Sequence, residues 1–223
     1  MLLTRRVLTG TLAAGALVAL SPALPRSPAA QAGRAPEDRI FDVLLRGHRI
    51  GQHAITFMPE VDGFWAATKL ELKVKLAFIT LIDMHHESRE LWRDRRLIEL
   101  KSVTDEDGNV FEVAAAATDD GIRVRSEDGL IVAPPQIHTS NSIWDVATML
   151  QREVIDARNG GIIGLVTEAL GDEEIEVSGQ MVTAARYRAI TPDAAAQLWY
   201  ADDQLVKVQL EVRGETVEYR LVA

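Results

Sequence analysis

Two adjacent histidines, His85 and His86, are the residues whose types and spacing come closest to a chemical site. Met84 and Glu87 flank them, and thioether, imidazole and carboxylate groups are ligands that copper or zinc accept. The pair falls within the predicted strand 83–92, and neighbouring side chains of a strand point to opposite faces. One ion would therefore need further ligands from elsewhere. We favour histidines on a polar surface and keep a metal site as the alternative.

Nucleophilic and acid–base chemistry have less support. The hydroxyl-rich run 139–142 precedes a predicted helix, so capping accounts for it, and no G-x-S-x-G elbow occurs. The chain has no cysteine, which excludes thiol catalysis and disulfides. Several carboxylates fall mostly on turns or on predicted outward faces: Asp83, Glu87, Glu90, Glu99 and Asp105. The sequence therefore predicts no catalytic residue and no cofactor, and a hydrolytic or metal-binding enzyme stays the least favoured alternative.

The elements that must position these side chains are strands. In residues 69–76 every even position is apolar and every odd position is charged, which is the period of a half-buried strand. A stretch near the C-terminal end alternates in the same way. The apolar members that we expect on the inner face are Leu70, Leu72, Val74, Leu76, Val206, Val208 and Leu210.

Turns rich in Asp and Gly recur at short intervals, which predicts an antiparallel meander of hairpins. The predicted strands are 40–45, 50–58, 69–76, 83–92, 97–104, 110–118, 122–126, 130–133, 163–169, 173–177, 182–191, 197–201, 205–213 and 215–222.

One helix is predicted, from Ser142 to about Arg158. Apolar residues within it recur at helical spacing, and Asn159-Gly160-Gly161 supplies an end signal. Even ten of these strands span roughly 50 Å, whereas a helix of about 15 residues is only ~22 Å long. We therefore predict a mainly β fold, in which a strongly curved antiparallel sheet (a half-barrel) wraps around one principal helix in a single domain over residues 39–223.

The first 32 residues have the pattern of a twin-arginine (Tat-type) signal peptide. Arg5 and Arg6 precede an apolar Ala/Leu-rich run, and Ala30-Gln31-Ala32 offers a cleavage site. The apolar run is too short to span a bilayer, so we expect cleavage, not a retained anchor. The mature chain would then lie in a bacterial periplasm or outside the cell, beginning with a disordered leader at 33–38.

Charge limits the partners. The chain has 24 basic and 33 acidic residues. Removal of Arg5, Arg6 and Arg26 with the signal leaves 21 basic against 33 acidic residues, a net charge of −12. Such a protein repels nucleic acid and anionic membrane surfaces. We expect no nucleic-acid partner and, after signal cleavage, no integral membrane segment.

Several segments resemble a known family in their order along the chain. They are residues 41–51, 86–94, 139–144, 198–200 and 206–207, and they are similar to an uncharacterised secreted bacterial family, the domain of unknown function 6134 family. More distantly, the pattern resembles the LolA/LolB-type periplasmic lipoprotein carriers. That resemblance implies a curved antiparallel sheet around helices and, by analogy, the sheltering of acyl chains.

We therefore predict a periplasmic binding or carrier protein that holds an apolar small molecule, a lipid or a lipoprotein on a concave sheet face. An envelope scaffold that binds another protein, with no small ligand, is the alternative. The residues predicted to line the concave face are Leu70, Leu72, Val74, Leu76, Trp92, Val206, Val208 and Leu210.

Overall fold

The computed structural model describes residues 35–76, 79–212 and 214–222, without the side chains of 75–76, 79–82 and 212. The predicted signal peptide lies outside the described residues, as do residues 33 and 34 of the predicted leader. Residues 35–38 have no regular secondary structure. In this stretch the Asp38 carboxylate accepts a hydrogen bond from the Phe57 backbone N–H at 2.8 Å.

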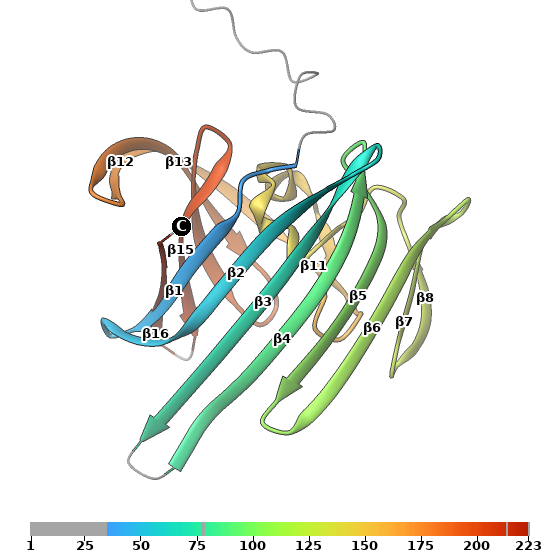
Figure 1. The fold of residues 1–223 in the computed structure, drawn as a ribbon, viewed down its shortest axis with the longest axis horizontal. Helices are drawn as coiled ribbons and strands as arrows, with labels where there is room; N and C mark the ends of the chain where they lie inside the picture. Colours follow the sequence, from blue (N-terminus) through green and yellow to red (C-terminus); the bar gives the residue numbers. More distant parts are fainter. Residues whose placement is uncertain (1–34, 77–78, 213, 223) are drawn as a thin grey trace, which may run out of the picture. The chain divides into compact units, whose positions relative to one another are not determined.

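Thirteen strands form one antiparallel sheet, in the order β12-β13-β14-β15-β16-β1-β2-β3-β4-β5-β6-β7-β8 (Figure 1). The first arm runs from the centre of the sheet to one edge, and its strands are β1 (Arg39–Leu45), β2 (His48–Glu60), β3 (Gly63–Leu76), β4 (Ile79–Arg93), β5 (Arg96–Glu106), β6 (Asn109–Thr118), β7 (Gly121–Ser126) and β8 (Gly129–Ala133). The second arm returns from the other edge, and its strands are β12 (Val166–Val177), β13 (Gln180–Ile190), β14 (Ala195–Ala201), β15 (Gln204–Val212) and β16 (Glu215–Leu221). Pairing of β1 with β16 joins the two arms.

Tight turns explain why consecutive strands pair. Both central residues have a positive φ in the two-residue turns Arg46-Gly47, Asp94-Arg95, Asp107-Gly108, Ser178-Gly179 and Asp202-Asp203. This backbone suits the twist of antiparallel strands, and Gly, Asn and Asp adopt it at low cost. The predicted antiparallel meander is confirmed.

Residues 134–165 link the two arms, and we call them the crossing segment. It contains β9 (His138–Thr139), two short 3₁₀ turns, η2 (Ser142–Trp144) and η3 (Val146–Leu150), and the strands β10 (Glu153–Ile155) and β11 (Ile162–Gly164). These strands form a separate sheet in the order β11-β10-β9. Figure 1 shows the large sheet curving, with the crossing segment in yellow between its arms.

The predicted principal helix at 142–158 is wrong, and no α-helix occurs in the part of the chain that the structure describes. Polar side chains compete for the backbone here: the Thr139 N–H donates to Ser142 Oγ, and the Ala147 N–H donates to Asp145 Oδ1. Such local bonds favour turns over a helix. Leu150, placed on the apolar stripe of the predicted helix, is 82% exposed.

The crossing segment fills the inner face of the sheet in place of the helix. One core cluster contains Ile137, Trp144 and Ile155 packed against β2–β8. A second cluster contains Met149 and Val154 from the crossing segment, packed against strands at the centre and in the second arm. The mainly β fold with one large antiparallel sheet is therefore confirmed, but irregular chain, not a helix, packs against its inner face. No helix in the described ranges is long and apolar enough to cross a membrane.

Candidate functional site

The residues predicted for a concave apolar face occupy several different environments. Trp92 is fully buried in the first core cluster, and Val208 is buried in the second. Leu70 and Leu72 are half-buried against the second cluster. The remaining members are Val74 and Leu210, which are half-buried, Leu76, whose side chain lies outside the described residues, and Val206.

A bulge separates Val206 from Val208. The pairing of β14 with β15 shifts between Trp199 and Tyr200, so that Lys207 faces Trp199 while Leu205 faces Tyr200. Val206 then joins a third cluster with Ile175, Ala184 and Trp199. The regular alternation assumed for residues 206–210 is interrupted here, because a bulge places one extra residue in the strand.

The two histidines of the metal hypothesis point to opposite faces of β4, as the strand period predicts. The imidazole of His85 is exposed, and its Nε2 lies 3.0 Å from Asp83 Oδ1. The side chain of His86 is buried on the inner face. Among the residues that the structure describes, no group of three or more His, Cys, Asp or Glu side chains is arranged to hold a metal ion.

The inner face carries a buried carboxyl group that sequence reasoning did not identify. Glu90 is 1% exposed. Its Oε1 accepts a hydrogen bond from Thr139 Oγ1 at 2.6 Å, and its Oε2 accepts one from Trp92 Nε1 at 2.9 Å. Burial raises the pKa of Glu90 to about 7, because no charge among the described residues offsets the loss of water. Glu90 thus ties β4 to the crossing segment.

His86 belongs to a neighbouring group of hydrogen bonds. Asn141 Nδ2 lies 2.9 Å from His86 Nε2 and 2.8 Å from Ser88 Oγ. His86 Nδ1 lies 2.7 Å from Thr104 Oγ1. If Asn141 donates, Nε2 is the accepting nitrogen and the ring is neutral. Burial lowers the pKa of His86, which agrees with the neutral form.

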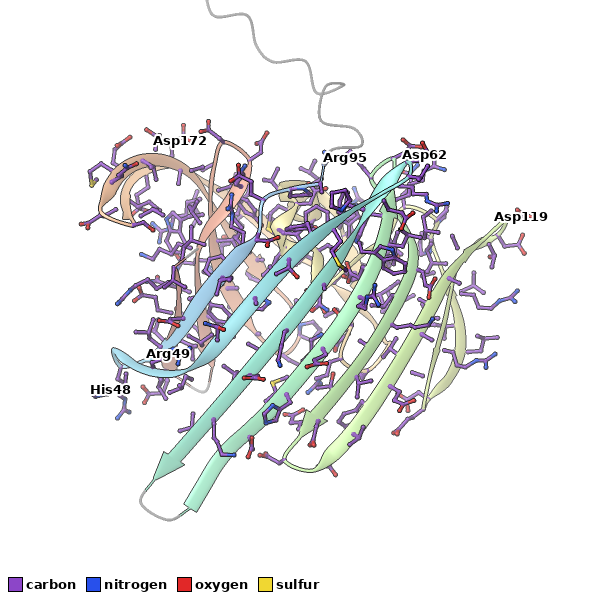
Figure 2. All side chains as sticks on the ribbon, viewed as in Figure 1. His48, Arg49, Asp62, Arg95, Asp119 and Asp172 are labelled. Carbon is purple, nitrogen blue, oxygen red and sulfur yellow. The ribbon has the colours of Figure 1, made fainter. Side chains whose placement is uncertain are left out.

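These buried groups anchor the crossing segment and do not form an open reaction site. Ser102 Oγ donates to the Ala157 carbonyl at 2.5 Å. At the end of the sheet that carries Arg95 and Asp62 (Figure 2), Arg95 pairs with Asp145 of the crossing segment at 2.8 Å. A substrate could reach Glu90 or His86 only if the segment moved.

A groove of about 1050 Å³ lies on the other, outer face of the sheet, across β2 to β7. Ser102 faces the crossing segment, so its neighbours Lys101 and Val103 point outward, and both line the groove. Small or apolar side chains form much of its floor: Ala54, Thr56, Ala67, Val103 and Ala114. Short side chains on adjacent strands leave this part of the sheet hollow.

Charged side chains surround the floor. Lys69 pairs with Glu87 at 3.3 Å and with Glu71 at 2.9 Å, and the guanidinium of Arg89 lies 4.9 Å from the Trp65 ring centroid. Lys101 pairs with Glu99 at 2.7 Å.

Arg125, also at the groove, forms no ion pair within the described ranges. The arrangement can hold an elongated apolar group and present a cation to an anionic end. None of the seven predicted concave-face residues whose side chains the structure describes lines this groove.

Sequence signals for these features were present but weak. Glu90 is one of the carboxylates that the sequence places mostly on turns or outward faces, whereas in the structure it is buried on the same face of β4 as His86 and Ser88. Three of the five floor residues are alanines at outward positions, and an alanine at such a position gives no hint of a hollow.

Comparison with known proteins identifies one family and one similar solved structure. The family model described as "Domain of unknown function (DUF6134)" matches residues 41–222. The fold is similar to the crystal structure of a beta-barrel-like protein of domain of unknown function DUF1849 from Brucella abortus, with a TM-score of 0.61 and 10% sequence identity over 84% of this chain and 96% of that one. At this identity the similarity concerns the fold alone. The curated proteins include no match to the sequence.

Proposed function

Because the chain belongs to the DUF6134 family, which brings no activity with it, we propose from its own geometry that it is an exported binding protein for an elongated apolar ligand with an anionic end, such as a fatty acid. The observation that carries the proposal is the groove of about 1050 Å³. Ligand sites in proteins commonly have volumes of about 300–1,000 Å³, mostly apolar linings and a few polar groups that fix orientation.

The chemistry of the groove favours this ligand class. The side chains of Ala54, Ala67 and Ala114 form no hydrogen bonds, so they can pack against the methylene groups of a ligand. Covering the exposed apolar surface of these alanines favours binding. Arg125 provides the cation for a carboxylate or phosphate end, because no salt bridge among the described residues involves it; Glu112 and Glu127 also line the groove. A charge-assisted hydrogen bond from a guanidinium would fix the ligand's orientation.

Export is the second part of the proposal. The twin-arginine segment predicts delivery to the periplasm, where an apolar molecule needs a carrier to cross water. The inner face, where we predicted the ligand, is largely occupied by the crossing segment. We therefore assign the ligand to the outer groove. That Leu70, Leu72 and Val74 line a ligand site on the inner face stays a prediction.

Binding of a fluorescent long-chain fatty acid to the protein tests this assignment. Ala114→Trp should fill the groove and weaken binding at least about tenfold, which corresponds to 1.4 kcal/mol. Ala116→Trp is the matched control, because Ala116 lies two residues further along β6 on the same face and does not line the groove. Equal affinities for the two variants would reject the site.

The role of Arg125 has its own test. Arg125→Gln should weaken binding of the fatty acid and leave binding of the corresponding fatty alcohol unchanged. Native mass spectrometry of protein purified from the periplasm should find a co-purifying acyl compound. No bound lipid and no binding of either probe would overturn the proposed function.

A further inference from the structure

The two outer edges of the large sheet are built differently. β12 forms one edge, and acidic residues occur along it: Glu168, Asp172, Glu173, Glu174 and Glu176. A bulge between Ala169 and Gly171 also interrupts its pairing. Charges and bulges are features that keep an edge strand from pairing with other chains. At the opposite edge, β8 has neither of these features.

β8 instead exposes three consecutive apolar side chains. Leu130, Ile131 and Val132 are 56%, 39% and 53% exposed. The register gives β8 one neighbour, β7, and no further backbone hydrogen bond of these three residues is found within the described ranges. Outward N–H and C=O groups of such a strand are a template for another strand. β8 is therefore a sheet edge with apolar flanks and unpaired backbone groups.

Two arginines on the neighbouring strand β7 indicate what kind of partner strand would fit beside β8. Arg123 lies opposite Val132, and Arg125 lies opposite Leu130, on the outer face of β7. Both are exposed, and neither forms an ion pair among the described residues. A strand added to β8 would lie about 4.8 Å beyond β8 and therefore about 10 Å from β7, a distance that an arginine and an acidic side chain can bridge together. Acidic residues on its outer face would meet both guanidinium groups.

We propose that β8 is a strand-addition site for an extended segment of a partner protein, in which Asp or Glu alternates with apolar residues. The acidic side chains of the partner segment would face Arg123 and Arg125. The methylene groups of these acidic side chains would cover Leu130 and Val132. The apolar residues would cover Ile131 on the other face. Main-chain hydrogen bonds supply affinity in this mode, and alternate side chains supply specificity.

A second copy of this chain fits β8 less well than such a segment. Antiparallel pairing of β8 with its own copy would bring four arginines to one face. An edge of five residues also contributes little of the roughly 1,200 Å² that stable interfaces bury. The occupant that charge favours is an acidic strand from a different protein.

Fluorescence anisotropy with two labelled peptides tests the proposal. One peptide alternates Glu with Val, and the other alternates Lys with Val. The full chain carries a net charge of −9, so non-specific attraction would favour the lysine peptide. We expect the opposite order, with the glutamate peptide bound at least about tenfold more tightly and more weakly at high salt. Equal binding, tighter binding of the lysine peptide, or no binding would overturn the proposal.

Two variants locate the binding at the edge. Arg123→Glu should reverse the preference between the peptides, and Arg123 does not line the ligand groove. Ile131→Asp should abolish binding, whereas Val110→Asp, at an exposed position in β6, should not. If Ile131→Asp changes only a concentration-dependent self-association measured by sedimentation, β8 pairs with a second copy and the proposal is wrong.

Discussion

Glu90 shows how a single side chain can couple the folding of this protein to pH. Its carboxyl group has two hydrogen-bond donors, Thr139 and Trp92, and no cation among the described residues. Burial therefore favours the neutral acid and raises the pKa of Glu90 from 4.5 to about 7. A buried carboxylate without a cation lowers the stability of the fold as soon as it ionises.

The sign of the effect follows from proton binding. Above pH 4.5 an unfolded chain releases the Glu90 proton, while the folded chain keeps it until about pH 7. The contribution of Glu90 to the free energy of unfolding therefore falls between these pH values, by about 3 kcal/mol in total at 1.36 kcal/mol per unit. Glu90→Gln should match the wild type at pH 4 and be more stable at pH 8.

Urea denaturation at both pH values measures this difference. Glu87→Gln is the control, because Glu87 is the exposed carboxylate of the same strand, and it should change little at either pH. A Glu90→Gln variant that is no more stable than wild type at pH 8 would show that the carboxyl group finds compensation elsewhere.

His53 has the opposite effect on the pH dependence of stability, because it destabilises the fold as the pH falls. It is buried between the Phe41 and Tyr219 rings, and its Nδ1 has no hydrogen-bond partner among the described residues. Burial lowers the pKa of His53 from 6.5 to about 4, with a smaller contribution from His86. As pH falls from 6.5 to 4, an unfolded chain takes up this proton first, so stability is lost in that window.

His53→Phe should therefore resist acid. The gap in melting temperature between variant and wild type should widen as pH falls from 7 to 4, because the variant has no imidazole to protonate. His48→Phe, at the exposed first residue of β2, serves as the control and should leave the pH dependence unchanged. A constant gap across this range would contradict the role assigned to His53.

At the scale of elements, the strict alternation of apolar and charged residues in β3 allows a direct test of the strand register. Leu72 packs against the second core cluster and pairs with Gly51 and Met84. Leu72→Asp would put an unpaired carboxylate beside apolar groups, which destabilises the fold strongly or forces the carboxylate to take up a proton. We expect loss of the cooperative thermal transition or a much lower melting temperature in circular dichroism.

Lys73→Gln is the matched control at the next position. Lys73 lies on the outer face and pairs with Asp83 at 2.5 Å, with both side chains partly exposed. Exposed ion pairs contribute little to stability, so the melting temperature should hardly change. Similar melting of the two variants would mean that the strand register is wrong.

The sequence predicted strands well and the crossing segment poorly, for a physical reason. Alternation in residues 69–76 and the Asp-Gly turns are local signals, and they predicted the meander. In residues 142–158 helical spacing of apolar residues competed with Ser, Thr and Asp side chains that bond the backbone. Pairing of Val154 with His138 then depends on tertiary contacts, which periodicity does not encode.

The site was less predictable than the fold. The groove results from small side chains that adjoin across β2 to β7, and that requires the register of every hairpin between them. The bulge that moves Val206 out of line with Val208 has no clear sequence signal either. Residues that line an open sheet face can be recognised only after the strands are aligned.

At the scale of the whole molecule, the proposed location depends on the first residues of the chain. Replacing Arg5 and Arg6 by lysine should abolish twin-arginine export and leave the full-length protein in the cytoplasm, as measured by immunoblotting of periplasmic and cytoplasmic fractions. Arg26→Lys, in the same segment, should be exported normally. Unchanged periplasmic delivery of the double variant would exclude this export route.

The seam between β1 and β16 has a consequence for how the chain folds. Each arm of the sheet pairs strands that are neighbours along the chain, whereas the pairing of Phe41 with Leu221 joins residues far apart in the sequence. Closing so long a loop carries a large entropic cost. Strands β1 and β16 are therefore expected to pair late in folding. Since Val222 also bonds the Ile40 carbonyl at 2.8 Å, a short linker could join these ends. A circular permutant opened within the crossing segment would then make the slowest contact local and should refold faster than the natural order.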